Sequence, residues 1–151
     1  MAMDTDDVVD TLNDLIETSK DGEQGYKTCA ENVKDSELKV VFANGARRCA
    51  EGAQELRMQV QRLGGDAETS GSIAGALHRG WANIKSAVTG KDDKAILNEV
   101  ERGEDVAVKS YRDALDSDLP ADVRTIVERQ FQGVQQNHDK VRDLRNLYAS
   151  R

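Results

Sequence analysis

Four ionisable side chains lie where the helices of this chain should be apolar. On a helical wheel, Glu101 and Glu104 fall within one apolar stripe. His138 falls within the apolar stripe of the next predicted helix along the chain, and Glu23 lies on the apolar stripe of the first predicted helix. An ionised carboxylate is costly in an apolar interior unless it is paired or holds a metal. We therefore expect these four side chains to meet in the interior, as ligands of a metal ion.

The spacing of these residues allows them to converge. If the last two helices form an antiparallel hairpin that turns near residue 118, Glu101 lies level with Gln135, and His138 lies one turn away, at about 5 Å. One imidazole with several carboxylates suits iron, manganese or zinc. A metal-free alternative stays open, because Arg48 lies level with Glu23. A buried network of Glu, Arg, His and Gln side chains would then satisfy every charge.

Hydrophobic periodicity predicts the helices that must position this site. Apolar residues recur at intervals of three and four along most of the chain. Two short turns make two antiparallel helix pairs, and a connection of about 28 residues joins the pairs, as in ferritin-like four-helix bundles. The sequence therefore predicts an all-α, ferritin-like antiparallel four-helix bundle with one long crossover. The predicted helices span residues 6–33, 37–63, 93–115 and 120–148, with an additional crossover helix at 72–88.

Several motifs resemble those of ferritin-like di-iron proteins. The Glu-Arg-Gly-Glu run at residues 101–104 resembles the Glu-x-x-Glu motif on the third helix of rubrerythrins. The Gln-Gln-Asn-His run at 135–138 resembles their fourth-helix Glu-x-x-His motif, with Gln in place of Glu. Glu23 resembles the first-helix ligand, and residues 51–54 resemble the second-helix motif with Gln in place of His. This distant resemblance to rubrerythrin and bacterioferritin implies oxidation of a metal or reduction of peroxide.

The chain also resembles, over nearly its whole length, a bacterial family of ferritin-like proteins that is defined as a domain of unknown function. The runs Gly-Ala-Leu-His-Arg-Gly-Trp at residues 75–81 and Glu-Arg-Gly-Glu-Asp at 101–105 carry this resemblance, together with Leu-Gly-Gly at 63–65. The resemblance implies a fold and no known reaction.

The second helix departs from the di-metal pattern. A full site has four carboxylates and two imidazoles, whereas Glu51 and Gln54 fall off the apolar stripe and Glu55 lies only near its edge. The expected site is therefore a single metal ion held by the four residues named first. Whether Glu51, Gln54 or Glu55 contributes to it is left open. His78, beside Trp81 in the crossover, is expected to cap a helix or lie at the surface.

Composition argues against several classes of function. The 151 residues carry a net charge of −7, with 32% charged and 4% aromatic residues, which predicts a single all-helical domain over residues 1–151. No basic patch with interleaved aromatic residues is present, which argues against nucleic-acid binding. No run of 18 apolar residues is present, which argues against a membrane span. The acidic N-terminus lacks a signal-peptide pattern, so we expect a cytoplasmic protein.

Two further expectations concern the thiols and self-association. Cys29 and Cys49 lie about 9 Å and about 20 Å from the first turn, which is too large an offset for a disulfide. We expect two small buried thiols in a reducing compartment. Val40, Ala43 and Met58 share a side of the second helix that is distinct from its main stripe, and we expect a homodimer contact there.

The sequence thus leaves two functions open. The first is a metal-binding bundle with a redox or stress-related role, and any enzyme activity would be rubrerythrin-like or ferroxidase-like, with iron, manganese or zinc. The second is a non-catalytic structural or interaction bundle, in which a metal-free Glu–Arg–His network forms the polar part of the core.

Overall fold

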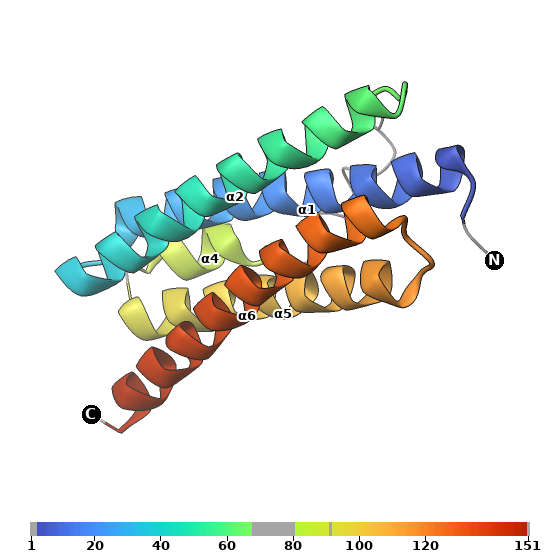
Figure 1. The fold of residues 1–151 in the computed structure, drawn as a ribbon. Coiled ribbons are helices and arrows are strands. Elements are labelled where there is room, and N and C mark those ends of the chain that lie inside the picture. Colours follow the sequence, from blue (N-terminus) through green and yellow to red (C-terminus); the bar gives the residue numbers. More distant parts are fainter. Residues whose placement is uncertain (1–2, 68–80, 91, 151) are drawn as a thin grey trace.

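Four long helices form two antiparallel pairs that pack into one bundle (Figure 1). The computed structural model describes residues 3–67, 81–90 and 92–150. α1 (Thr5–Asn32) pairs with α2 (Ser36–Arg62), α5 (Asp93–Asp116) pairs with α6 (Ala121–Ala149), and the short α4 (Ile84–Thr89) lies against α1 and α5. Within the described ranges no strand occurs. The prediction of an all-α bundle is confirmed, and every predicted end of the four long helices lies within one residue of the observed end.

Local chemistry explains why the helices begin and end where they do. Asp4 Oδ1 accepts a hydrogen bond from the Asp7 N–H at 2.8 Å, and the side chain of Asp35 caps the start of α2 in the same way. An N-cap of this kind stabilises a helix by about 1 kcal/mol. Beyond the end of α2, Gly64 takes a φ of 80°, a conformation that costs glycine little and other residues more.

One carboxylate ties the turn between α1 and α2 to the second helix pair. Asp93, the first residue of α5, accepts hydrogen bonds from the backbone N–H groups of Lys34 and Asp35 at 2.9 and 3.1 Å. The hydroxyl of Tyr148, near the end of α6, donates to Asp35 Oδ2 at 2.6 Å. These contacts hold the two pairs in a defined axial position at this end of the bundle.

The crossover meets the bundle through Trp81. A Cβ added at Gly25 of α1 or at Gly103 of α5 would lie 2.3 Å from a carbon of the indole ring, so the ring occupies a notch that only glycines leave open. Trp81 is buried there. Beside it, Glu99 accepts a hydrogen bond from the backbone N–H of Asn83 at 2.9 Å, which attaches the start of α4 to α5.

The predicted crossover helix at 72–88 is only partly covered by the structure. Of this range, the described part contains α4, which begins at Ile84 and runs one residue beyond the predicted end, to Thr89. Residues 72–80 of the prediction, His78 among them, lie outside the described residues.

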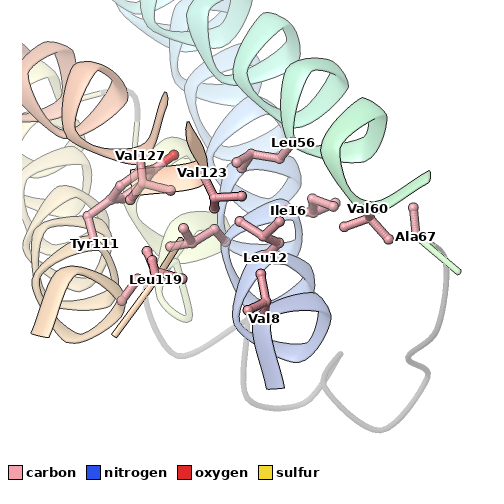
Figure 2. Close-up of a cluster of buried hydrophobic side chains, with 12 residues drawn as sticks. Val8, Leu12, Ile16, Leu56, Val60, Ala67, Tyr111, Leu119, Val123 and Val127 are labelled. Atoms are coloured by element: carbon pink, nitrogen blue, oxygen red, sulfur yellow. The ribbon is translucent and has the colours of Figure 1, made fainter. Parts of the chain in front are cut away.

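Two separate apolar clusters form the core. The first lies toward the start of α1, and Figure 2 shows side chains from both helix pairs meeting there. The second includes residues on both sides of the α1–α2 turn. A fully buried large apolar side chain contributes about 1.5–3 kcal/mol, so the two clusters hold the bundle together at separate levels. Their largest fully buried side chains are Leu12, Leu15, Ile16 and Leu56 in the first and Leu38, Phe42, Ile96 and Leu97 in the second.

The surface of α2 carries exposed apolar side chains. Val40 is 60% and Met58 58% exposed, and Ala43 is also exposed. A homodimer contact at these residues stays a prediction. Over the described ranges, no helix combines the length with the hydropathy that a bilayer span requires.

The notch that holds Trp81 can be tested with one added methyl group. In Gly103→Ala the new Cβ would lie 2.3 Å from Trp81 Cε2, so the ring must move, and we expect the free energy of unfolding to fall by about 1–3 kcal/mol. Gly90→Ala is the matched control, because nothing lies within 4 Å of a Cβ there. Urea denaturation of both variants measures the difference, and equal stabilities would contradict the assigned role of Gly103.

Candidate functional site

Three polar side chains from three helices form a buried, hydrogen-bonded group, which we call the polar triangle. Tyr26 of α1 donates a hydrogen bond from its hydroxyl to Oε2 of Glu104 on α5. The side-chain amide of Asn137 on α6 donates to the Tyr26 hydroxyl at 2.7 Å and to Glu104 Oε2 at 2.5 Å. Glu104 is only 3% exposed. The polar triangle therefore links α1, α5 and α6 inside the bundle.

Aromatic rings and a glycine position Tyr26. A Cβ at Gly45 of α2 would lie 2.9 Å from Tyr26 Cδ1, so the tyrosine ring occupies room that only glycine leaves. Trp81 meets the same ring edge-on at a centroid distance of 5.3 Å, and Phe42 lies 6.4 Å from it. The ring is therefore held by α2 and by the crossover while its hydroxyl contacts Glu104.

Burial changes the protonation of Glu104. Removal from water raises the pKa of this carboxyl from 4.5 to about 8, and this effect outweighs the hydrogen bonds from Tyr26 and Asn137 and the charge of Arg48, which lower it. The pKa of Tyr26 also lies well above its usual value, because of burial and then of the neighbouring Glu104 charge. Near neutral pH the folded protein thus keeps a proton on the Glu104 carboxyl.

The second oxygen of Glu104 lacks a hydrogen bond. Both contacts within the polar triangle go to Oε2, whereas Oε1 is buried and has no partner in the described part of the chain. A buried polar atom without a partner typically costs about 1–3 kcal/mol. A further hydrogen bond to this atom would therefore stabilise the polar triangle most.

A cavity of about 1070 Å³ adjoins the polar triangle. Tyr26 and Glu104 line it, together with residues of all four long helices. Small residues form part of its wall, among them Ser19, Gly22 and Ala107. The cavity exists because these positions lack the large side chains that fill the two apolar clusters.

Arg48 of α2 lines the same cavity. Its Cδ lies 3.5 Å from the position of a Cβ on Gly133, so its stem reaches across to α6. Burial raises the pKa of Glu104, of Tyr26 and of Cys49, the last to about 12, and the positive charge of Arg48 counteracts the rise in all three. The charge of Arg48 thus acts on these groups from an exposed position, and in the described ranges Arg48 forms no ion pair.

Neighbouring charges on α2 are engaged elsewhere. Glu55 pairs with Arg129 and accepts a hydrogen bond from Gln130 at 2.8 Å. Glu51 lies 3.7 Å from Arg47 on the protein surface, and Gln54 is exposed. None of the three belongs to the polar triangle, whereas Glu51 and Glu55 line the adjoining cavity.

The four predicted ligands do not come together in this structure. Glu104 is buried as expected, and Glu23 is half-buried near Cys49, whose pKa its charge helps to raise. Glu101 accepts a hydrogen bond from Arg145 at 2.5 Å, outside the polar triangle. The imidazole Nε2 of His138 lies 2.6 Å from Asp105 Oδ1, and the ring is 22% exposed. In this structure Glu101 and His138 thus lie outside the polar triangle, and a metal site at the four residues stays a prediction.

The position of the hairpin turn explains this difference. The contacts Glu104–Asn137 and Tyr111–Gln130 are both centred between residues 120 and 121, whereas the sequence analysis placed the turn near residue 118. Partners on α6 consequently lie about five residues further along the chain. The apolar stripe of α6 still faces the core, with Val123, Val127 and Val141 buried, but Asn137 now lies level with Glu104.

Three polar residues of the core were not identified from the sequence, namely Asn13, Glu99 and Asn137. Asn137 lies three residues after Val134 and four before Val141, which is a helical core spacing, but the adjacent His138 satisfies the same spacing. Glu99 is 4% exposed and pairs with Arg102 at 3.1 Å. Its burial depends on the crossover, and no local pattern indicates it.

The donors that are present do not fit a resident metal. In the described residues, no three His, Cys, Asp or Glu side chains are grouped so that they could hold a metal ion. Glu104 has a tyrosine and an amide as its neighbours, and iron, manganese and zinc sites use imidazole, carboxylate or thiolate ligands.

The raised pKa of Glu104 predicts a pH-dependent stability. Between pH 4.5 and about 8 the folded chain holds a proton that the unfolded chain releases, so the contribution of Glu104 to stability should be fully present below pH 4.5 and be lost as the pH rises to about 8, by at most about 1.4 kcal/mol per unit. Glu104→Gln cannot ionise and should lose this dependence. Urea denaturation at pH 5 and pH 8 tests it, with the exposed Glu51→Gln as control. A Glu104→Gln protein with the wild-type pH profile would refute the assignment.

The two adjacent residues on α6 should differ in their effect on stability. Asn137→Leu leaves Tyr26 and Glu104 without their amide donor, and we expect a loss of about 1–3 kcal/mol. His138→Leu removes only a partly exposed contact with Asp105, and we expect a loss of less than about 1 kcal/mol. Thermal denaturation compares the two variants. A larger effect at His138 would mean that the imidazole, and not the amide, belongs to the core.

The fold is shared with a known structure. The chain is similar to a two-domain protein from Anabaena variabilis that contains DJ-1/ThiJ/PfpI-like and ferritin-like domains, with 17% sequence identity and a TM-score of 0.81. The match covers 97% of this chain and 41% of that protein. At this level of identity the similarity supports a ferritin-like fold. Among curated proteins, no sequence matches this chain significantly.

Residues 7–117 match the family described as "Domain of unknown function (DUF2383)". The matched segment includes α2, α4, α5 and most of α1, and with them Tyr26 and Glu104 of the polar triangle. The chain therefore belongs to the DUF2383 family and has a ferritin-like fold.

Proposed function

We propose that this chain is a metal-free binding bundle, in which the polar triangle fixes the arrangement of the helices and the adjoining cavity accepts a small molecule. The observation that carries the proposal is the set of neighbours around Glu104. Its Oε2 is satisfied by a tyrosine and an amide, and the polar triangle contains no second carboxylate and no imidazole.

A buried polar group suits such a role. Buried polar contacts commonly specify which arrangement of helices forms, since a wrong arrangement leaves the polar atoms unpaired. Ligand sites in helical bundles lie in the core between facing helices. The cavity has both features, because it lies between the long helices and adjoins the polar triangle, which spans three of them.

The alternative is a rubrerythrin-like or ferroxidase-like oxidoreductase with iron, manganese or zinc. The ion pair of Glu101 with Arg145 and the contact between His138 Nε2 and Asp105 argue against it. A metal site at the four predicted residues would require both side chains to leave these partners and turn into the core.

Metal analysis separates the two functions. Protein purified from cells grown with added iron and manganese should contain well under one metal ion per chain, and Glu104→Gln and His138→Leu should not change that content. Elemental analysis by mass spectrometry measures it, with Glu51→Gln as a surface control. One metal ion per chain in the wild type, lost in both core-site variants and kept in the control, would support the oxidoreductase instead.

A further inference from the structure

We propose that the cavity binds a small carboxylic acid with an apolar body, whose carboxylate contacts Arg48 and the carboxyl group of Glu104. This inference rests on the proposed binding function and names the class of ligand. Three observations carry it: the charge of Arg48, the free oxygen of Glu104 and the apolar walls between the helices.

The charge of Arg48 sets the sign of the ligand. Its neighbours on the α2–α6 side neutralise one another, since Arg47 pairs with Glu51 and Arg129 pairs with Glu55. Arg48 lines the cavity without an ion pair among the described side chains. A guanidinium binds carboxylates through several parallel N–H donors, so an anionic group is the expected partner here.

Glu104 provides the second polar contact. It lines the cavity, and its Oε1 is a buried oxygen with no hydrogen-bond partner in the described part of the chain. Because Tyr26 and Asn137 both donate to Oε2, a proton held by this carboxyl belongs on Oε1. There it would be donated to a ligand carboxylate, and the two acids would share one proton.

Asp14, Asp21, Lys109 and Asp113 also line the cavity, and another part of its wall suits a hydrocarbon. Leu15, Val134 and the ring of Tyr111 line the cavity beside the small residues. The hydroxyl of Tyr111 is already bound to Gln130 Oε1 at 2.8 Å, so this ring offers its apolar faces. An apolar body placed there would gain about 25 cal/mol for each Å² removed from water.

Other ligand classes fit these groups less well. At the end of the cavity that Arg48 and Glu104 line, an ammonium group would be repelled by Arg48 and would meet a Glu104 that retains its proton near neutral pH. A neutral hydrocarbon would leave both polar groups without a partner. A strongly hydrated phosphate would lose its water against apolar walls, at a cost that one guanidinium does not recover.

Octanoate is a suitable probe, with octylammonium and 1-octanol as probes of equal chain length and different charge. Isothermal titration calorimetry of the full chain should show one octanoate site and weaker binding of the other two. Arg48→Gln should weaken octanoate binding about tenfold or more. The adjacent Arg47→Gln does not line the cavity and should change it by less than about twofold. Ala107→Leu should abolish binding by filling the cavity, with circular dichroism verifying that each variant remains helical.

Three results would overturn the inference: tighter binding of octylammonium than of octanoate, equal weakening by the two arginine variants, or no octanoate binding to the helical wild-type protein. These outcomes are distinct from a failure of the proposed function. A stoichiometric metal ion would disprove the metal-free bundle whatever octanoate does, whereas a metal-free protein that ignores octanoate would disprove only the ligand class.

Discussion

The hydrogen bonds to the buried carboxyl of Glu104 are the constraint on which the arrangement of three helices depends. This carboxyl cannot be removed from water without partners, and its partners come from α1 and α6. A slip of one residue along a helix rotates its side chains by about 100°. Such a slip would move Tyr26 or Asn137 out of contact with Glu104 and leave buried polar atoms without hydrogen-bond partners. The apolar clusters tolerate many packings, whereas the polar triangle tolerates few.

The crossover takes part in this constraint through a single side chain. Trp81 lies in the notch formed by Gly25 and Gly103 and contacts the ring of Tyr26. Two glycines on different helices are therefore needed so that a tryptophan from a third segment can support a tyrosine. Glycine within a helix costs about 1 kcal/mol relative to alanine, and burial of the indole offsets that cost. The same use of small residues leaves the cavity next to Glu104 open.

Fold and site chemistry separate in this protein. The chain shares a ferritin-like fold with a protein of 17% sequence identity, yet two positions that resemble ferritin-like ligands have other partners. Glu101 pairs with Arg145, and His138 pairs with Asp105. A fold constrains where a site lies, and the individual side chains decide what it does. In this bundle a tyrosine and an amide surround the buried acid.

Much of the fold could be read from the sequence, because helices depend on local signals. Periodic apolar residues and short turns predicted every end of the four long helices to within one residue, and the burial of Glu104 followed from its place among apolar neighbours. The choice between Asn137 and His138 did not follow, since both have core spacing from Val134 and Val141. Only the axial position of α6 against α5 decided it. That position depends on contacts between residues far apart in the chain, which no local pattern records.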